Sequence, residues 1–107
     1  MVVVAEALID WEEVKNRGER RAVLTALDKL AQLGPLLTPP HVKTLSGADG
    51  LLELRPRQGQ SAVRPIVARV GPVFLVLAFS ADHGKGMGRD IDRAAARLKA
   101  YRTATEI

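Results

Sequence analysis

The chain has 107 residues, no cysteine, and 16 lysine and arginine residues against 12 acidic ones, which gives a net charge of +4. This is the length of one domain, residues 1–107, and the lack of cysteine excludes disulfides and thiolate metal sites. The longest apolar run, residues 73–79, is far shorter than the roughly 18–20 residues of a membrane span. Since the first residues also lack the basic start of a signal peptide, we expect a cytoplasmic protein without a membrane partner.

The first residues of the chain fit two alternatives: a short strand over residues 2–5, or a helix that starts near Ala5. A short helix is predicted after them. Asp10 and Glu13 have the three-residue spacing of a capping box, which predicts a helix over residues 11–16. Arg17-Gly18 is expected to break it.

A second helix is predicted over residues 19–33. Apolar residues recur there at spacings of three and four, the pattern of a helix with one buried side. Gly34 and Pro35 end it, because glycine readily adopts the C-terminal cap conformation and proline cannot continue a helix. The two helices are expected to form a hairpin that covers a sheet. The apolar stripe consists of Val23, Leu27 and Leu30, widened by Leu24 and Ala31.

A small antiparallel sheet is predicted next, followed by a loop and a C-terminal helix. The last strand is apolar on both faces, as expected of a strand inside a sheet. Residues 81–88 form a glycine-rich loop, and the helix starts at residue 89 or 90 and ends near 102. We therefore predict an α+β fold: a small, mostly antiparallel sheet packed against an N-terminal helical hairpin, with a C-terminal helix. The strands are expected over residues 52–57, 62–70 and 73–79, after an extended segment at 42–45; the buried side of the last helix carries Ile91, Ala94, Leu98 and Tyr101.

Arginines cluster on the predicted sheet. Side chains alternate along a strand, so Arg55 and Arg57 share a face with Glu53, and Pro56 between them predicts an early strand end or an edge. Arg64 ends an otherwise apolar face of the next strand, near the rim. The second half of the chain holds ten basic and five acidic residues, against six and seven in residues 1–50. This balance indicates a polyanionic partner, most simply nucleic acid, unless the charges only keep the protein in solution.

Four pieces of the chain occur in a familiar order: ALDKLAQLGPLL, HVKTLSGADGLLELRPR, AVRPIVARVGPVFLVLAF and RDIDRAAARLKAY, within residues 22–102. Together they resemble the RelE/ParE superfamily of bacterial toxins, most of all its phage-derived, HigB-like branch. The resemblance implies a RelE-like fold and the toxin of a type II toxin–antitoxin system, without a cofactor and with a cognate antitoxin, usually of the helix-turn-helix type, as partner. RelE- and HigB-type members cleave mRNA in the ribosomal A site, whereas ParE-type members inhibit DNA gyrase.

The resemblance also implies which residues carry the activity. Arg55 matches the arginine of the family's E-L-R strand, and Arg64 matches the arginine that opens the next strand. Lys43 matches the lysine before the turn, and Lys85 lies in a loop where the family often has lysine. The implied activity is a metal-independent endoribonuclease that acts on mRNA with the ribosome as partner.

The chemistry of RNA cleavage fits these residue types. Attack of a 2′-OH on the adjacent phosphate needs cations on the phosphate, and guanidinium groups such as those of Arg55 and Arg64 bind phosphate oxygens in a fork. His83 is the candidate general base or acid; Lys43 and Lys85 are alternatives, because neighbouring cations make a lysine easier to deprotonate. No cluster has metal-ligand spacing, so no metal is expected. Further RNA-binding residues are expected at Arg57, Arg69, Arg93 and Arg97.

Plainer interpretations stay open for the same residues. Arg55 and Arg57 can be a solvated strand face, Arg64 can pair with Glu53 across the hairpin, and His83 can be an ordinary exposed histidine, as His41 is in its loop. For the whole protein, the alternatives are a gyrase-type inhibitor without nuclease activity, and a degenerate member that only binds its antitoxin or nucleic acid.

Overall fold

The computed structural model describes residues 2–3, 16–39, 41–45, 50–56, 62–71, 73–80 and 87–105. Its elements are β1 (Val2–Val3), α2 (Arg17–Leu33), a short 3₁₀ turn (Gly34–Leu36), β2 (Val42–Thr44), β3 (Leu51–Leu54), β4 (Arg64–Val70), β5 (Val73–Ser80) and α3 (Met87–Thr105). The predicted helix over residues 11–16, apart from Asn16, lies outside the described residues.

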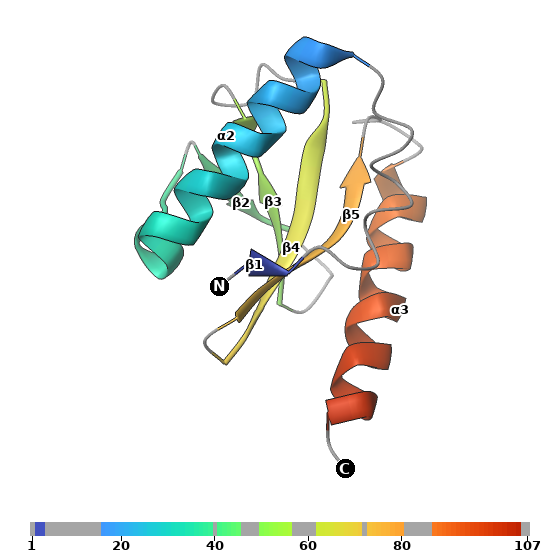
Figure 1. Cartoon of the computed structure of the whole chain (residues 1–107). Helices are drawn as coiled ribbons and strands as arrows, with labels where there is room; N and C mark the ends of the chain where they lie inside the picture. Colours follow the sequence, from blue (N-terminus) through green and yellow to red (C-terminus); the bar gives the residue numbers. More distant parts are fainter. Residues whose placement is uncertain are drawn as a thin grey trace.

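The strands form one sheet in the order β1-β5-β4-β3-β2 (Figure 1). The neighbouring pairs β5–β4, β4–β3 and β3–β2 are antiparallel, and β1 pairs with β5 in parallel. α2 packs on one face of this sheet and α3 on the other. The predicted α+β fold with a mostly antiparallel sheet is therefore confirmed.

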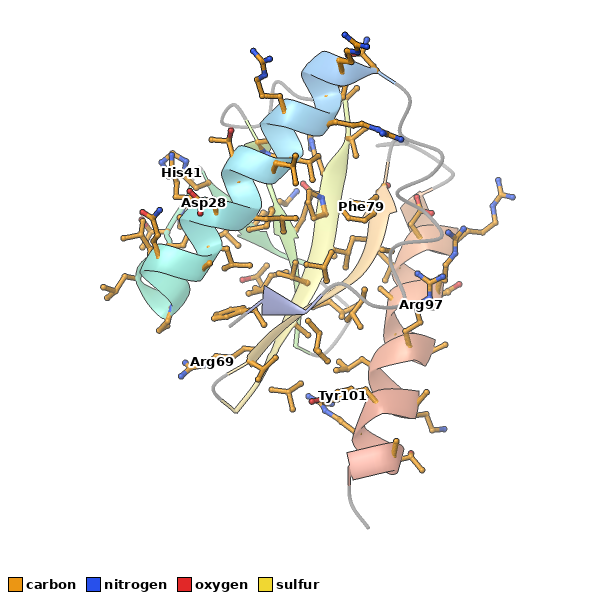
Figure 2. The ribbon with its side chains drawn as sticks, in the orientation of Figure 1. Asp28, His41, Arg69, Phe79, Arg97 and Tyr101 are labelled. Carbon is orange, nitrogen blue, oxygen red and sulfur yellow. The ribbon has the colours of Figure 1, made fainter. Side chains whose placement is uncertain are left out.

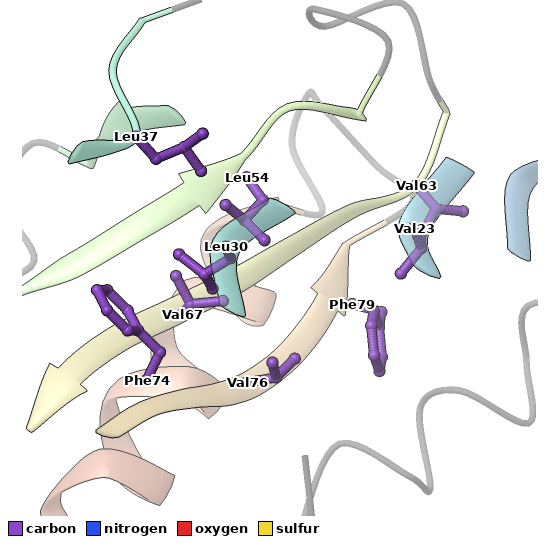
Figure 3. Close-up of a cluster of buried hydrophobic side chains, with 9 residues drawn as sticks. All are labelled: Val23, Leu30, Leu37, Leu54, Val63, Val67, Phe74, Val76 and Phe79. Atoms are coloured by element: carbon purple, nitrogen blue, oxygen red, sulfur yellow. The ribbon is translucent and has the colours of Figure 1, made fainter. Parts of the chain in front are cut away.

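Each face of the sheet has its own hydrophobic core. On one face Val23 and Leu30 of α2 pack over strand residues such as Val67 (Figure 3). On the other face Ala94 and Leu98 of α3 pack over the opposite side of β4 and β5. Because helices cover both faces, the strands between them are apolar on both sides, as predicted for β5.

α2 begins earlier than the sequence pattern predicted. Asn16 has an extended backbone, with φ −76° and ψ 124°, and its side chain accepts a hydrogen bond from the N–H of Glu19 at 3.1 Å. Asn16 is therefore the N-cap of α2, and the predicted break at Arg17-Gly18 is wrong because these two residues form the first turn. The predicted end is confirmed: Gly34 has φ 52°, which favours glycine, and its N–H donates to Leu30.

The buried side of α2 is also shifted from the predicted stripe. Val23 and Leu30 are buried and Leu27 packs against the core, as predicted. Leu24, however, is 57% exposed and Ala31 is exposed as well. The residues that widen the stripe lie on its other side and include the buried Ala22, so the predicted position of Leu24 is wrong.

The remaining boundaries differ from the prediction by a few residues. β3 ends at Leu54, before Pro56, so the early strand end is confirmed, and β4 starts at Arg64 rather than at residue 62. α3 is longer than predicted at both ends, and its predicted buried side is confirmed by the packing of Ala94 and Leu98. Within the described part of the chain, no helix is both long enough and apolar enough to cross a membrane.

The shifted stripe of α2 predicts different costs for two leucines on one helix. Leu30→Ala removes a side chain that is 2% exposed and should lower the free energy of unfolding by about 3 kcal/mol. Leu24→Ala should change it by less than about 0.5 kcal/mol. Urea denaturation of both variants measures this difference, and equal losses would show that Leu24 is part of the core.

Candidate functional site

Four polar or basic residues lie in a row across one end of the sheet. The strand register pairs Glu53 with Ile66 and Arg64 with Ser80. Continued two residues past the Glu53–Ile66 pair, the antiparallel register places Arg55 opposite Arg64. The backbone N–H of Arg55 donates to the carbonyl of His41 at 2.8 Å. The row, called the polar row below, therefore runs from His41 through Arg55 and Arg64 to Ser80.

A buried carboxylate joins the two arginines of the polar row. The side chain of Glu53 is only 3% exposed, and its Oε1 accepts a hydrogen bond from Nη1 of Arg64 at 3.1 Å. The same oxygen lies 3.9 Å from Nε of Arg55. The sequence left open whether Arg64 pairs with Glu53 across the hairpin, and this pairing is confirmed. Glu53 itself is not part of a solvated strand face.

The burial of Glu53 constrains both guanidinium groups. An ionised carboxylate inside a protein is tolerated only when charged or hydrogen-bonding partners compensate it. Arg64 is close enough for a charge-assisted hydrogen bond, whereas the 3.9 Å contact of Arg55 is electrostatic only. Among these three side chains, Glu53 carries one negative charge and the two arginines carry two positive charges. The side chains of Arg55 and Arg64 remain 31% and 16% exposed, so both can be reached from solvent.

The start of β4 is tied to the start of α2. One oxygen of Glu19, Oε2, accepts hydrogen bonds from the backbone N–H groups of Ala62 and Val63, at 3.0 and 3.3 Å. These are the two residues directly before Arg64. The first turn of α2 therefore fixes where Arg64 enters the sheet, and a carboxylate is also favoured there by the helix dipole.

The other end of the polar row is tied to α3. The hydroxyl of the fully buried Ser80 donates to Oδ2 of Asp90 at 2.7 Å. The second oxygen of Asp90, Oδ1, lies 3.5 Å from Nη2 of Arg93. This chain of contacts holds the N-terminal part of α3 against the end of β5 and brings Arg93 to the same end of the sheet.

Lys43, another of the predicted site residues, lies at the same end of the sheet as Arg55 and Arg64. It pairs directly with Glu53 in the register of β2 and β3, and directly paired residues share a face of the sheet. Its side chain is exposed on the edge strand. Of the other predicted site residues, Arg57, His83 and Lys85 lie outside the described residues.

Two of the predicted RNA-binding arginines lie elsewhere. Arg69 is near the opposite end of β4 and its Nε donates to the carbonyl of Gly71 at 3.2 Å. Arg97 is only half-exposed, and its Nη1 donates to the carbonyl of Leu77 at 2.6 Å. Arg97 therefore links α3 to β5, and the structure separates Arg69 from the polar row.

Sequence reasoning missed the groups that organise the site. The pairing of Glu53 with Arg64 was foreseen as an alternative, but not the burial of Glu53, and Ser80 and Asp90 were not singled out. His41 was assigned to a loop, although counting back from a β2–β3 pairing places it beside Arg55. No group of three or more histidine or acidic residues that could hold a metal ion is found within the described ranges.

The central role of Glu53 can be tested by its isosteric amide. Glu53→Gln leaves two neighbouring guanidinium groups without their carboxylate, so it should lower the free energy of unfolding by about 3 kcal/mol. Asp92→Asn removes an exposed carboxylate of α3 and should cost less than about 0.5 kcal/mol. Urea unfolding of both variants gives the comparison. A Glu53→Gln variant as stable as the control would contradict the constraint.

Comparison with known proteins gives a family. The family described as phage-derived protein Gp49-like (DUF891) matches residues 12–99, which contain α2, the sheet from β2 to β5 and most of α3. No curated protein matches the chain. The matched region includes Glu53, Arg55, Arg64 and the rest of the polar row. The chain therefore belongs to the Gp49-like family of phage-derived proteins, a family associated with RelE/ParE-like toxins of toxin–antitoxin systems.

Proposed function

We propose that this protein is a HigB-like toxin of a type II toxin–antitoxin system and that it cleaves mRNA on the ribosome. The observation that carries the proposal is the arginine pair at the end of the sheet. Arg55 and Arg64 both approach one oxygen of the buried Glu53, at 3.9 and 3.1 Å. Two guanidinium groups held this close together suit a single phosphate group, which offers several oxygens to two donors.

The proposed RNA cleavage accounts for every bond and proton without a metal or a cofactor. The ribose 2′-oxygen bonds to the adjacent phosphorus and the bond from phosphorus to the 5′-oxygen breaks. The products are a 2′,3′-cyclic phosphate and a 5′-hydroxyl. A base takes the 2′ proton, and an acid gives a proton to the leaving 5′-oxygen. The phosphorane between these steps carries extra negative charge, which Arg55 and Arg64 would stabilise by about 3 kcal/mol per donor.

The proposal also gives roles to the remaining residues. Glu53 holds the arginines in place before the substrate arrives, so that little reorganisation is needed in the transition state. His83 stays the proposed base or acid, with Lys43 and Lys85 as alternatives. Of these three residues, Lys43 belongs to the described part of the chain, and it shares a face of the sheet with Glu53. Arg93, beside Asp90, and Arg57 are proposed to bind the RNA backbone.

A ribosome and an antitoxin complete the proposal. Without a strong acid–base pair among the described residues of the polar row, the ribosome would order the substrate at the site. A helix-turn-helix antitoxin would neutralise the toxin by covering the arginine pair with an acidic segment. A structure of that complex with Arg55 and Arg64 open to solvent would contradict this mode of neutralisation.

The proposed function predicts the behaviour of conservative arginine variants. Arg55→Lys and Arg64→Lys keep the charge but lose the planar fork, so each should lower mRNA cleavage by about 100-fold. Arg17→Lys, in the first turn of α2, is the matched control and should cleave as the wild type does. The measurement is inducible expression in bacteria, with growth curves and primer extension on an abundant mRNA.

Three outcomes of this experiment separate the alternatives. Growth arrest with cuts inside translated regions, lost in both arginine variants, supports the ribosome-dependent nuclease. Arrest without cuts would point to a gyrase-type inhibitor, and no arrest in cells that contain soluble protein would point to a module that only binds its antitoxin. Either of the last two results would overturn the proposal.

A further inference from the structure

A groove of about 450 Å³ lies between α2 and the polar row. Arg21, Thr25 and Lys29 line it from α2, and His41 and Arg55 line it from the ends of β2 and β3. Figure 2 shows His41 beside α2. None of the described residues in the lining of this groove is acidic. The groove therefore opens next to the arginine pair and presents positive charge on both of its walls.

The groups that a ligand can reach in this groove are polar. Arg21, Thr25 and Lys29 are exposed, and His41 and Arg55 are half-exposed. The apolar residues of the floor are mostly buried under them, as the fully covered Leu54 illustrates. A ligand would therefore meet cations and a hydroxyl rather than an apolar surface.

The spacing of the α2 residues makes a continuous track. Arg21, Thr25 and Lys29 follow one another at intervals of four, so their side chains stand above one another on one side of the helix. From the first to the last, this side extends about 12 Å along the helix axis. Such a track offers contacts to more than one phosphate of a chain that runs along it.

We propose that this groove is a second RNA subsite, which holds the phosphate backbone of the single strand next to the cleaved position. The inference rests on the proposed function and deepens it. Arg55 belongs to both places, because it approaches Glu53 beside Arg64 and also lines the groove. A strand whose scissile phosphate lies on Arg55 and Arg64 would thus continue past His41 toward Lys29 and Arg21.

A phosphate backbone fits the groove better than an acidic peptide. A peptide is usually anchored by apolar or aromatic side chains in a desolvated pocket, and the apolar floor here is mostly covered. Among the described residues that line the groove there is no Phe, Tyr or Trp, the side chains on which bases most often stack. Recognition would be independent of base sequence and strongly dependent on salt.

The subsite can be tested with an RNA that cannot be cleaved. The probe is a fluorescein-labelled 2′-O-methyl oligouridylate of about 12 nucleotides, which lacks the attacking hydroxyl. Its affinity is measured by fluorescence anisotropy over a range of KCl concentrations. The groove variant is Arg21→Gln/Lys29→Gln. The matched control is Arg17→Gln/Lys99→Gln, which removes one arginine and one lysine from exposed helix positions outside the groove and has the same net charge.

The groove variant should lose two phosphate contacts. The slope of log affinity against log salt should then become shallower by about 1.4, at roughly 0.7 per contact with a single strand, whereas the control should keep the wild-type slope. Equal changes in both variants would assign the effect to overall charge and overturn the subsite. A fluorescein-labelled peptide of alternating Glu and Leu is the second probe, and loss of peptide binding but not of RNA binding in the groove variant would also overturn it.

The two proposals fail in different ways. If the groove variant loses RNA contacts but the wild type cleaves no mRNA, the subsite stands and the nuclease proposal is wrong. If the wild type cleaves mRNA and the groove variant binds the oligonucleotide with the wild-type slope, the nuclease stands and the subsite is wrong. Circular dichroism of both double variants confirms that they are folded, as expected for glutamine at exposed helix positions.

Discussion

The carboxylate of Glu53 is the constraint on which the site depends. A charge that is 3% exposed has to be compensated, because desolvation of an unpaired carboxylate costs several kcal/mol. Arg64 and Arg55 provide that compensation, and in doing so they are held around one oxygen atom. The same contact thus stabilises the sheet and brings two guanidinium groups together at its end. The arginines of this structural ion pair are also the ones that we propose to bind the phosphate.

The fold explains why this cluster lies at the end of the sheet. Helices cover both faces, and the middle of β4 and β5 is filled by two hydrophobic cores. The polar groups lie at the end of the sheet, where those cores stop, and hydrogen bonds from both helices hold this end in place. Glu19 of α2 holds the residues before Arg64, and Asp90 of α3 holds Ser80. The two helices therefore do more than cover the sheet, because each fixes one side of the polar row.

Much of the fold, and less of the site, could be predicted from the sequence. Spacing of apolar residues predicted α2, α3 and the strands, and the resemblance predicted the importance of Arg55 and Arg64. Local pattern could not show that Glu53 is buried. Leu52 and Leu54 alternate with it, which implies that the face of Glu53 is open to solvent. In the structure α3, which is distant in the sequence, covers that face. The position of His41 beside Arg55 follows from the register of β2 and β3, which is a pairing between segments and not a local pattern. The prediction that Leu24 is buried was wrong because a spacing of three or four residues does not show on which side of the apolar stripe further buried residues lie.

The central claim is that Arg55 and Arg64 act together on one phosphate because Glu53 holds them as a pair. The most direct test is the single-turnover rate of mRNA cleavage on programmed ribosomes for Arg55→Lys, Arg64→Lys and the double variant. Groups that act as a unit are not additive. The account predicts a loss of about 100-fold for each single variant and a double variant within about 10-fold of either one. A double variant whose loss equals the product of the two single losses would show that the arginines act independently, and would contradict the account.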